Sequence, residues 1–283
     1  MYQSSVVISV YKDVTALLSI LYALSSQTIE NFEVIVSEDG CSSEMSTALA
    51  GQTLISKHRV LHLSQEDRGF RKNRALNNAI CKSRSAHIIF IDGDCIPSTK
   101  FVSAHQFLSK GAFVTSGRRL ELGPVMSEKL RREPREINRL SDRWGYFFSI
   151  PRLLLDHGKN VESGLHSEFL HLCRSKKPTP LLGCNFSCPK DQLETVNGFN
   201  EDYEQPGIGE DTDLQWRLEA AGFRIVDAKF QANIFHLHHE RSYGLSPENV
   251  RIFENTKREH LVVSCRGLSS HQDRQSLSAF ERR

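Results

Sequence analysis

Three groups of carboxylates stand where strands of this chain are expected to end. Glu38 and Asp39 follow one β-branched run, Asp67 follows a second, and Asp92 and Asp94 close a third. Oxygen ligands suit hard divalent cations, and a site with few protein ligands keeps positions open for phosphate oxygens. A single acid at a strand end often only forms a turn or caps a helix. Three acidic groups on one sheet edge nevertheless favour a shared binding site.

The sequence Asp92-Gly93-Asp94 presents two carboxylates separated by a residue without a side chain. Glycine lets a ligand approach the backbone there. The D-x-D pattern is weak by itself, because acid pairs at this spacing are common by chance. Its place at the end of a buried strand makes it a candidate for holding Mg²⁺ or Mn²⁺ with a nucleotide.

A second set of candidate groups lies late in the chain. Glu210 and Asp211 open a helix, where the helix dipole favours the ionised carboxylate that a general base requires, although ordinary capping is the competing interpretation. His236 and His239 can reach one ion if their segment curls, and imidazole shifts the preference from Mg²⁺ toward Mn²⁺ or another first-row metal. A histidine cluster by itself is more often surface or core packing.

The elements that position these groups alternate strand and helix through the first part of the chain. Strands are expected over residues 6–10, 32–37, 60–63 and 87–91, with helical stretches between them. This alternation predicts an α/β fold with a mostly parallel central sheet and helices on both faces. In such sheets ligands bind at the carboxyl ends of the strands, which is where the carboxylates stand.

Composition excludes several classes of protein. Hydrophobic residues make up 39% of the 283 residues and charged residues 25%, as in folded globular chains. A formal charge of +2 is too balanced to predict nucleic-acid binding. The apolar runs are strand-sized, the first residues lack a secretory signal pattern, and seven scattered cysteines suit a reducing compartment. We therefore expect a folded cytoplasmic protein without a membrane span or a nucleic-acid partner.

In their order and spacing, the motifs resemble those of family 2 glycosyltransferases with the GT-A fold, and the later half is similar to galactosyltransferase-type and chondroitin-polymerase-type members. The resemblance covers residues 4–240. It rests on residues 37–42 (SEDGCS), 65–71 (QEDRGFR), 92–95 (DGDC), 198–201 (GFNE) and 209–214 (GEDTDL). It implies a Rossmann-like nucleotide-diphospho-sugar transferase fold.

The resemblance also implies roles for individual residues. Those expected to hold the UDP-sugar are Glu38, Asp39, Asp67, Arg71, Asp92, Gly93 and Asn185. Those expected to hold Mn²⁺ or Mg²⁺ on the diphosphate are Asp94, His236 and His239, with the register among His236, His238 and His239 open. Asp211 matches the catalytic base, preceded by Glu210. The arginine of the family's R-N-x-G-I motif is absent, and Lys72 or Arg74 is a candidate to replace it.

The chain divides into four expected parts. Residues 1–117 are the nucleotide-sugar-binding half, 118–180 a helical insert or lid, 181–265 the acceptor-binding and catalytic half, and 266–283 a polar tail. In the insert, a helical stripe is formed by Ile137, Leu140, Trp144, Phe147 and Phe148. Packing of this stripe on the body, a lid over the acceptor, and a membrane or partner contact through residues 128–150 remain alternatives.

The resulting hypothesis is a metal-dependent inverting glycosyltransferase. It would move a hexose or N-acetylhexosamine from a UDP-sugar to a glycan or glycolipid hydroxyl in polysaccharide or glycoconjugate synthesis, in the cytoplasm or at the inner membrane face. A catalytically silent nucleotide-sugar or glycan-binding subunit is one alternative. A metal-dependent nucleotidyltransferase is another, although the chain has no glycine-rich, lysine-containing phosphate loop near its N-terminus.

Overall fold

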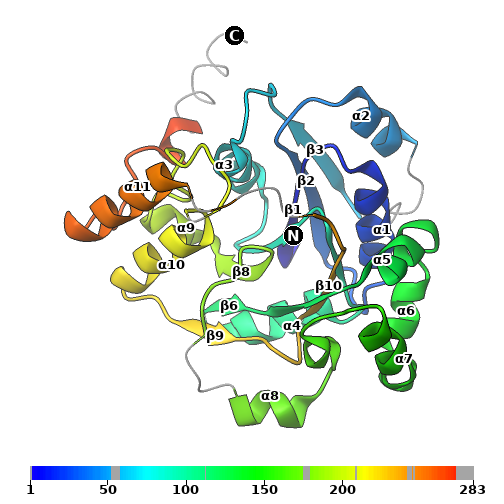
Figure 1. The fold of residues 1–283 in the computed structure, drawn as a ribbon. Helices are drawn as coiled ribbons and strands as arrows, with labels where there is room; N and C mark the ends of the chain where they lie inside the picture. Colours follow the sequence, from blue (N-terminus) through cyan, green and yellow to red (C-terminus); the bar gives the residue numbers. More distant parts are fainter. Residues whose placement is uncertain are drawn as a thin grey trace.

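The computed structural model of the chain is built on a seven-stranded sheet in the order β3-β2-β1-β4-β8-β6-β9 (Figure 1). It describes residues 2–51, 58–111, 113–174, 179–207, 209–240, 244 and 246–271. The strands are β1 (Ser4–Val10), β2 (Phe32–Glu38), β3 (Val60–Ser64), β4 (His87–Asp92), β6 (Val114–Ser116), β8 (Asn185–Pro189) and β9 (Ile225–Asp227). β3, β2, β1 and β4 run parallel, and β8 runs antiparallel to both β4 and β6. The predicted mostly parallel α/β sheet is confirmed.

Helices cover both faces of this sheet because the strands bury side chains on both sides. Val6 and Ile8 belong to one core cluster, with apolar residues of α1 (Val14–Ser25). The intervening Val7 belongs to a second cluster, with residues of α3 (Lys72–Lys82) and α10 (Asp211–Ala220). This alternation follows from the two-residue period of a strand. The remaining helices around the sheet are α2 (Ser43–Ala50), α4 (Phe101–Leu108), η1 (Ser109–Gly111), α9 (Lys190–Thr195) and α11 (Pro247–Arg258).

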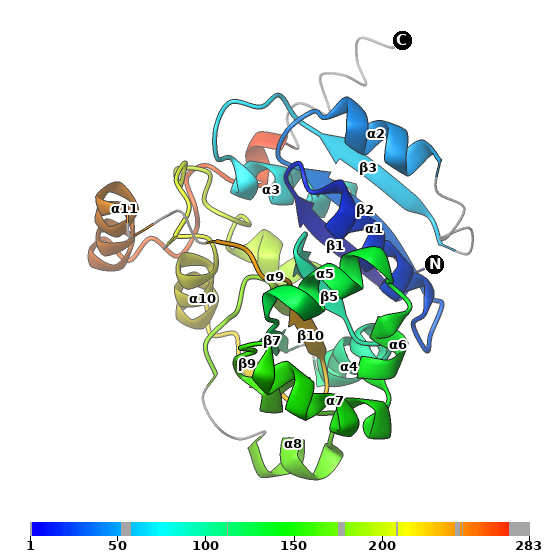
Figure 2. The same ribbon diagram turned by 45° about the vertical axis from the view of Figure 1, so that its right-hand side comes forward.

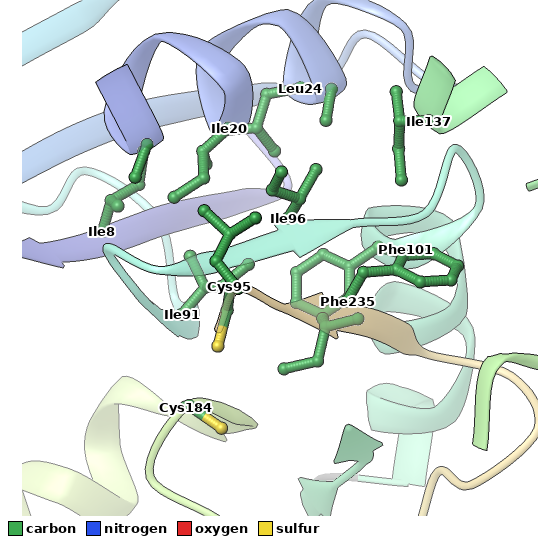
Figure 3. Packing of buried hydrophobic residues seen from close by; sticks show 14 of the residues in the cluster. Ile8, Ile20, Leu24, Ile91, Cys95, Ile96, Phe101, Ile137, Cys184 and Phe235 are labelled. Atoms are coloured by element: carbon green, nitrogen blue, oxygen red, sulfur yellow. The ribbon is translucent and has the colours of Figure 1, made fainter. Parts of the chain in front are cut away.

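A second sheet of three strands lies against the first cluster, in the order β5 (Cys95–Pro97), β10 (Asn233–His236) and β7 (Arg118–Glu121). Figure 3 shows Ile20 and Leu24 from α1 approaching Ile96 of β5, with Phe235 of β10 on the other side of β5. β10 pairs antiparallel with β5, so that His236 lies opposite Cys95. The end of β10 is thereby fixed beside the D-x-D segment.

The predicted insert contains several short helices. They are α5 (Pro124–Arg132), α6 (Glu136–Ser141), α7 (Arg143–Leu155), η2 (Val161–Gly164) and α8 (Glu168–Arg174), and α5 to α7 follow one another down the front of the molecule in Figure 2. The predicted stripe is divided between two environments. Ile137 and Leu140 are buried in the core, whereas Trp144, Phe147 and Phe148 are exposed.

The strands of the central sheet come from both predicted halves of the chain, since β8 of the later half inserts between β4 and β6 of the earlier one. Residues 175–178 of the predicted insert and 272–283 of the predicted tail lie outside the described residues. In the described start of that tail, Leu268 is buried in the second core cluster. Among the helices that the structure describes, none is both long and apolar enough to cross a membrane.

Candidate active site

A cavity of about 720 Å³ opens at the carboxyl ends of β1, β2 and β4. Its wall includes four carboxylates, three cations and two imidazoles, from Asp13, Asp39, Asp92, Asp94, Lys72, Arg119, Arg131, His236 and His239. Tyr11 and Phe70 add aromatic surface. This is the sheet edge at which α/β proteins bind ligands.

Asp94, His236 and His239 meet at one point of the wall. Asp94 Oδ2 lies 3.4 Å from His236 Nε2 and 3.2 Å from His239 Nε2. Burial acts to raise the pKa of Asp94, but hydrogen bonds from the two imidazoles outweigh it and hold the pKa well below its usual range. The carboxylate is therefore ionised at neutral pH and faces two ring nitrogens.

This donor set fits a divalent first-row metal. Asp94, Cys95 and His236 each place one possible ligand atom within 4.8 Å of the others. A site made of carboxylate and imidazole groups suits Mn²⁺ better than Mg²⁺. His238, the third histidine of this segment, is exposed, and its backbone N–H donates to Ser127 Oγ at 2.7 Å. The structure thus brings together Asp94, His236 and His239, the three residues expected to hold the metal.

Position 93 has no room for a side chain, because residues of β1 lie against it. Its N–H donates to the Ser9 carbonyl at 2.7 Å, and a Cβ at this position would lie 2.8 Å from that oxygen. In the structure, strand β1 makes the close approach to Gly93, where the sequence had suggested a ligand. It brings the two carboxylates of the D-x-D to the edge of the cavity.

Lys72 connects the two halves of the site. Its Nζ donates to Asp92 Oδ1 at 2.7 Å and to Glu210 Oε1 at 2.9 Å, and only 14% of its side chain is exposed. Burial acts to lower the pKa of Lys72, but the two carboxylates raise it well above its usual value. Of the two candidates to replace the missing family arginine, Lys72 lines the cavity.

Glu210 and Asp211 have different surroundings at the start of α10. Burial raises the pKa of Glu210, with help from Asp92 and Asp211 and against the pull of Lys72. Asp211 Oδ2 accepts a bond from the Gly183 N–H at 3.1 Å, and its Oδ1 accepts one from the Thr212 hydroxyl at 3.2 Å. Neither Glu210 nor Asp211 lines the cavity, but Glu210 forms an ion pair with Lys72, which does.

The buried side chain of Arg217 ties α10 to the segment that precedes it. Arg217 Nε donates to Asp213 Oδ2 at 2.7 Å, and its Nη1 donates to the carbonyls of Val196 and Gly198. Asn77 of α3 also binds the Gly198-Phe199 region, since it donates to the Phe199 carbonyl and accepts from the Phe199 N–H. The GFNE motif thus joins α3 to α10.

The residues expected to hold the base and ribose lie at the other end of the cavity. Asp39 accepts bonds from Gln65 Nε2 and from the Arg71 backbone N–H, each at 2.7 Å. Asp67 accepts from the Tyr11 hydroxyl at 3.2 Å and lies 3.1 Å from Lys12 Nζ, which lowers its pKa. Asp39 and Tyr11 line the cavity directly, whereas Asp67 and Arg71 contact residues of its wall.

Two expected contact residues lie away from the cavity wall. Glu38 is buried, accepts a bond from the Ser42 N–H at 2.8 Å and pairs with His62 Nε2 at 2.8 Å. Asn185 is also buried, and its amide donates to the carbonyls of Arg118 and Ala232 while its oxygen meets His105. Their visible role is to shape the loop after β2 and to join β8 to the second sheet.

The wall residues that sequence reasoning missed include Tyr11, Asp13, Arg119 and Arg131. Tyr11 directly follows the first strand, and that position was an available signal. Arg119 comes from β7, and Arg131, from the end of α5, lies 2.8 Å from Asp13 Oδ1. Their positions depend on the second sheet and the insert, for which the motifs gave no signal.

Comparisons with known families match two segments of the chain. Residues 5–121 match the family described as glycosyl transferase family 2. Residues 165–240 match the family described as the N-terminal domain of galactosyltransferase. No curated protein matches the chain.

Solved structures with a similar fold come from glycosyltransferases. The chain resembles the mannosyltransferase PcManGT from Pyrobaculum calidifontis in complex with GDP-Man and Mn²⁺, with a TM-score of 0.54 and 15% identity over 85% of this chain and 58% of that one. It resembles S. aureus TarS with a TM-score of 0.61 and 13% identity over 95% of this chain and 41% of that one. A shorter TarS chain in complex with UDP-GlcNAc gives a TM-score of 0.59 and 13% identity, with 95% and 69% of the two chains covered. At these identities the likeness establishes the GT-A fold.

Proposed function

We propose that this protein is an inverting glycosyltransferase, because residues 5–121 match glycosyl transferase family 2 and residues 165–240 match the N-terminal domain of galactosyltransferase. It moves a hexose or N-acetylhexosamine from a UDP-sugar to a hydroxyl group of a glycan or glycolipid, in polysaccharide or glycoconjugate synthesis. The observation that carries this proposal is the meeting of Asp94, His236 and His239 on the cavity wall, beside Asp92 and Lys72.

The cavity has groups suited to each part of a nucleotide-sugar. Asp39, held in one orientation by Gln65 and the Arg71 N–H, is placed to accept a bond from the nucleoside, and Tyr11 offers a ring for its base. Arg119 and Arg131 on the wall favour the negatively charged diphosphate. Mn²⁺ or Mg²⁺, held by Asp94, His236 and His239, would neutralise charge on the leaving diphosphate.

The transfer is a single displacement. The acceptor oxygen bonds to the anomeric carbon as the bond from that carbon to the diphosphate breaks, and UDP leaves with the electron pair. Asp211 takes the proton of the acceptor hydroxyl. The Gly183 N–H and the Thr212 hydroxyl hold the Asp211 carboxylate in place at the start of α10.

The products distinguish this proposal from its alternatives. We would incubate the protein with Mn²⁺ and a panel of UDP-sugars, with GDP-Man included, and identify the nucleotide released by slow hydrolysis. Metal-dependent release of UDP from one member, lost on Asp94→Ala, supports the proposal. Release of pyrophosphate would indicate a nucleotidyltransferase, and tight donor binding without turnover would indicate a binding subunit.

We further propose a cytoplasmic location, with a peripheral contact at the inner membrane face through residues within 128–150. All seven cysteines are free thiols, which supports a reducing compartment.

A further inference from the structure

The outward face of α7 is apolar. Its large exposed residues are Trp144, Phe147, Phe148, Leu154 and Leu155, with exposed fractions of 64%, 57%, 74%, 57% and 82%. Pro151, also exposed, lies among them in the helical spacing. Positions three, four, seven, ten and eleven residues after Trp144 share one side of a helix. Soluble proteins rarely leave so continuous an apolar strip in water without a binding partner.

The inner face of the same helix already packs against the body. Tyr146, Ser149 and Leu153 are buried there, and the Tyr146 hydroxyl donates to the Val161 carbonyl. Because a different side of α7 already contacts the core, the exposed residues are not the side of the helix that packs on the protein. Trp144 and Phe147 meet edge to face with ring centroids 6.4 Å apart, and Phe147 meets Phe148 at 5.8 Å. The aromatic rings form a connected surface.

The charges around this strip are positive. Helix α7 contains no acidic residue, and Arg143 and Arg152 flank its apolar face on opposite sides. Arg143 lies 5.9 Å from the Trp144 ring. Arg135 of the preceding turn is exposed as well. Asp142, next to the strip, is engaged as the N-cap through its bond to the Gly145 N–H.

We propose that the outward face of α7 binds the surface of a membrane that contains anionic phospholipids. Aromatic and leucine side chains enter the interfacial region, and the flanking arginines contact phosphate groups. A second copy of the chain is the less suitable occupant. Pairing two α7 faces would gather Arg143 and Arg152 of both copies around one contact with no acidic residue of α7 to neutralise them, and like charges would oppose it.

The surface goes beyond the catalytic proposal and can be tested apart from it, because vesicle binding requires neither donor nor metal. We would sediment the full chain with vesicles of phosphatidylcholine alone and with phosphatidylglycerol added. Trp216→Phe leaves Trp144 as the single tryptophan, whose emission should shift to shorter wavelength on binding. Phe147→Ser with Phe148→Ser should weaken partitioning at least about tenfold.

Two further variants make the result specific. Phe107→Ser is the matched control, because Phe107 on α4 is 66% exposed but lies outside α7, and it should bind like the wild type. Arg143→Gln with Arg152→Gln should remove the preference for phosphatidylglycerol. Thermal unfolding confirms that each variant is folded. Equal partitioning of the phenylalanine double variant and the wild type, or dimer formation that this variant abolishes in place of vesicle binding, would overturn the proposal.

Discussion

The Lys72 Nζ atom lies 2.9 Å from Glu210 Oε1, although 138 residues separate the two positions in the chain. The same ammonium ion lies 2.7 Å from Asp92 Oδ1. One side chain therefore holds the end of β4, with its D-x-D carboxylates, against the start of α10, where the proposed base lies. Its distances from the two carboxylates fix how the donor side and the acceptor side face each other.

Replacement of this lysine should therefore reduce turnover. Lys72→Met leaves Asp92 and Glu210 as neighbouring carboxylates without their shared cation, and we expect kcat to fall by about 10² while the fold persists. Steady-state kinetics with the active donor measure the effect. The matched control is Lys229→Met, since Lys229 has the same 14% exposure and a 2.8 Å pair with Glu162 outside the cavity. Wild-type turnover in Lys72→Met would contradict the role.

The three clustered histidines should respond differently to substitution. His236→Ala and His239→Ala each remove an imidazole next to Asp94, so we expect the Mn²⁺ concentration for half-maximal activity to rise by about tenfold or more. His238→Ala is the control because its ring is not part of this group. Metal titration of activity, with calorimetry of Mn²⁺ binding, measures both. A large effect of His238→Ala alone would reassign the ligands.

Substitutions of Asp211 and Glu210 should distinguish a direct role in proton transfer from a role in holding the site together. Asp211→Asn removes the proposed proton acceptor, so turnover should fall by about 10²–10⁴ while UDP binding changes little. Glu210→Gln keeps the shape but weakens the partner of Lys72, and we expect a smaller loss. Comparison of turnover with UDP affinity by calorimetry tests this. If Asp211→Asn weakened both to the same extent, Asp211 would be a binding group instead of the base.

Stability should fall in mild acid because of two buried histidines. Burial lowers the pKa of His105 to about 3 and of His87 to about 4, from an ordinary 6.5. Both rings are neutral in the folded protein. Their contribution to stability is therefore complete above pH 6.5. It is lost as the pH falls below 6.5, because only the unfolded chain then takes up protons. Between pH 6.5 and 5 we expect each to cost about 1.6 kcal/mol of the free energy of unfolding.

Urea unfolding at several pH values measures this loss. His105→Gln should reduce the pH dependence, because glutamine does not titrate, whereas the exposed His238→Gln should leave it unchanged. A pH dependence of His105→Gln identical to that of the wild type would show that another group is responsible.

The central sheet was predictable because its signals are local. Runs such as residues 87–91 are apolar on both faces, and the acids that follow them mark the sheet edge where the cavity opens. The resemblance also named Asp94, His236 and His239 together, and in the structure both imidazoles lie beside that carboxylate. Neither signal required knowledge of distant contacts.

The misplaced elements depend on contacts between distant parts of the chain. The apolar stripe of the insert was compatible with one helix, but the chain breaks at Asp142, between α6 and α7, so that Trp144 and its neighbours are exposed while Ile137 stays buried. The resemblance implied that Asn185 contacts the UDP-sugar, and in the structure its amide donates to two backbone carbonyls in the core. Tyr11, Arg119 and Arg131 reach the cavity from three separate elements, which the sequence pattern does not bring together.

Strand β10 is the middle strand of the three-stranded sheet and carries His236 to Asp94. A nascent chain that has emerged from the ribosome only as far as β8 holds the complete D-x-D but neither imidazole. Domains form progressively from the N-terminus during synthesis, so the parallel strands can assemble well before the proposed cation site is complete. Premature termination between these strands would release a product with the carboxylates in place and without the groups that complete them.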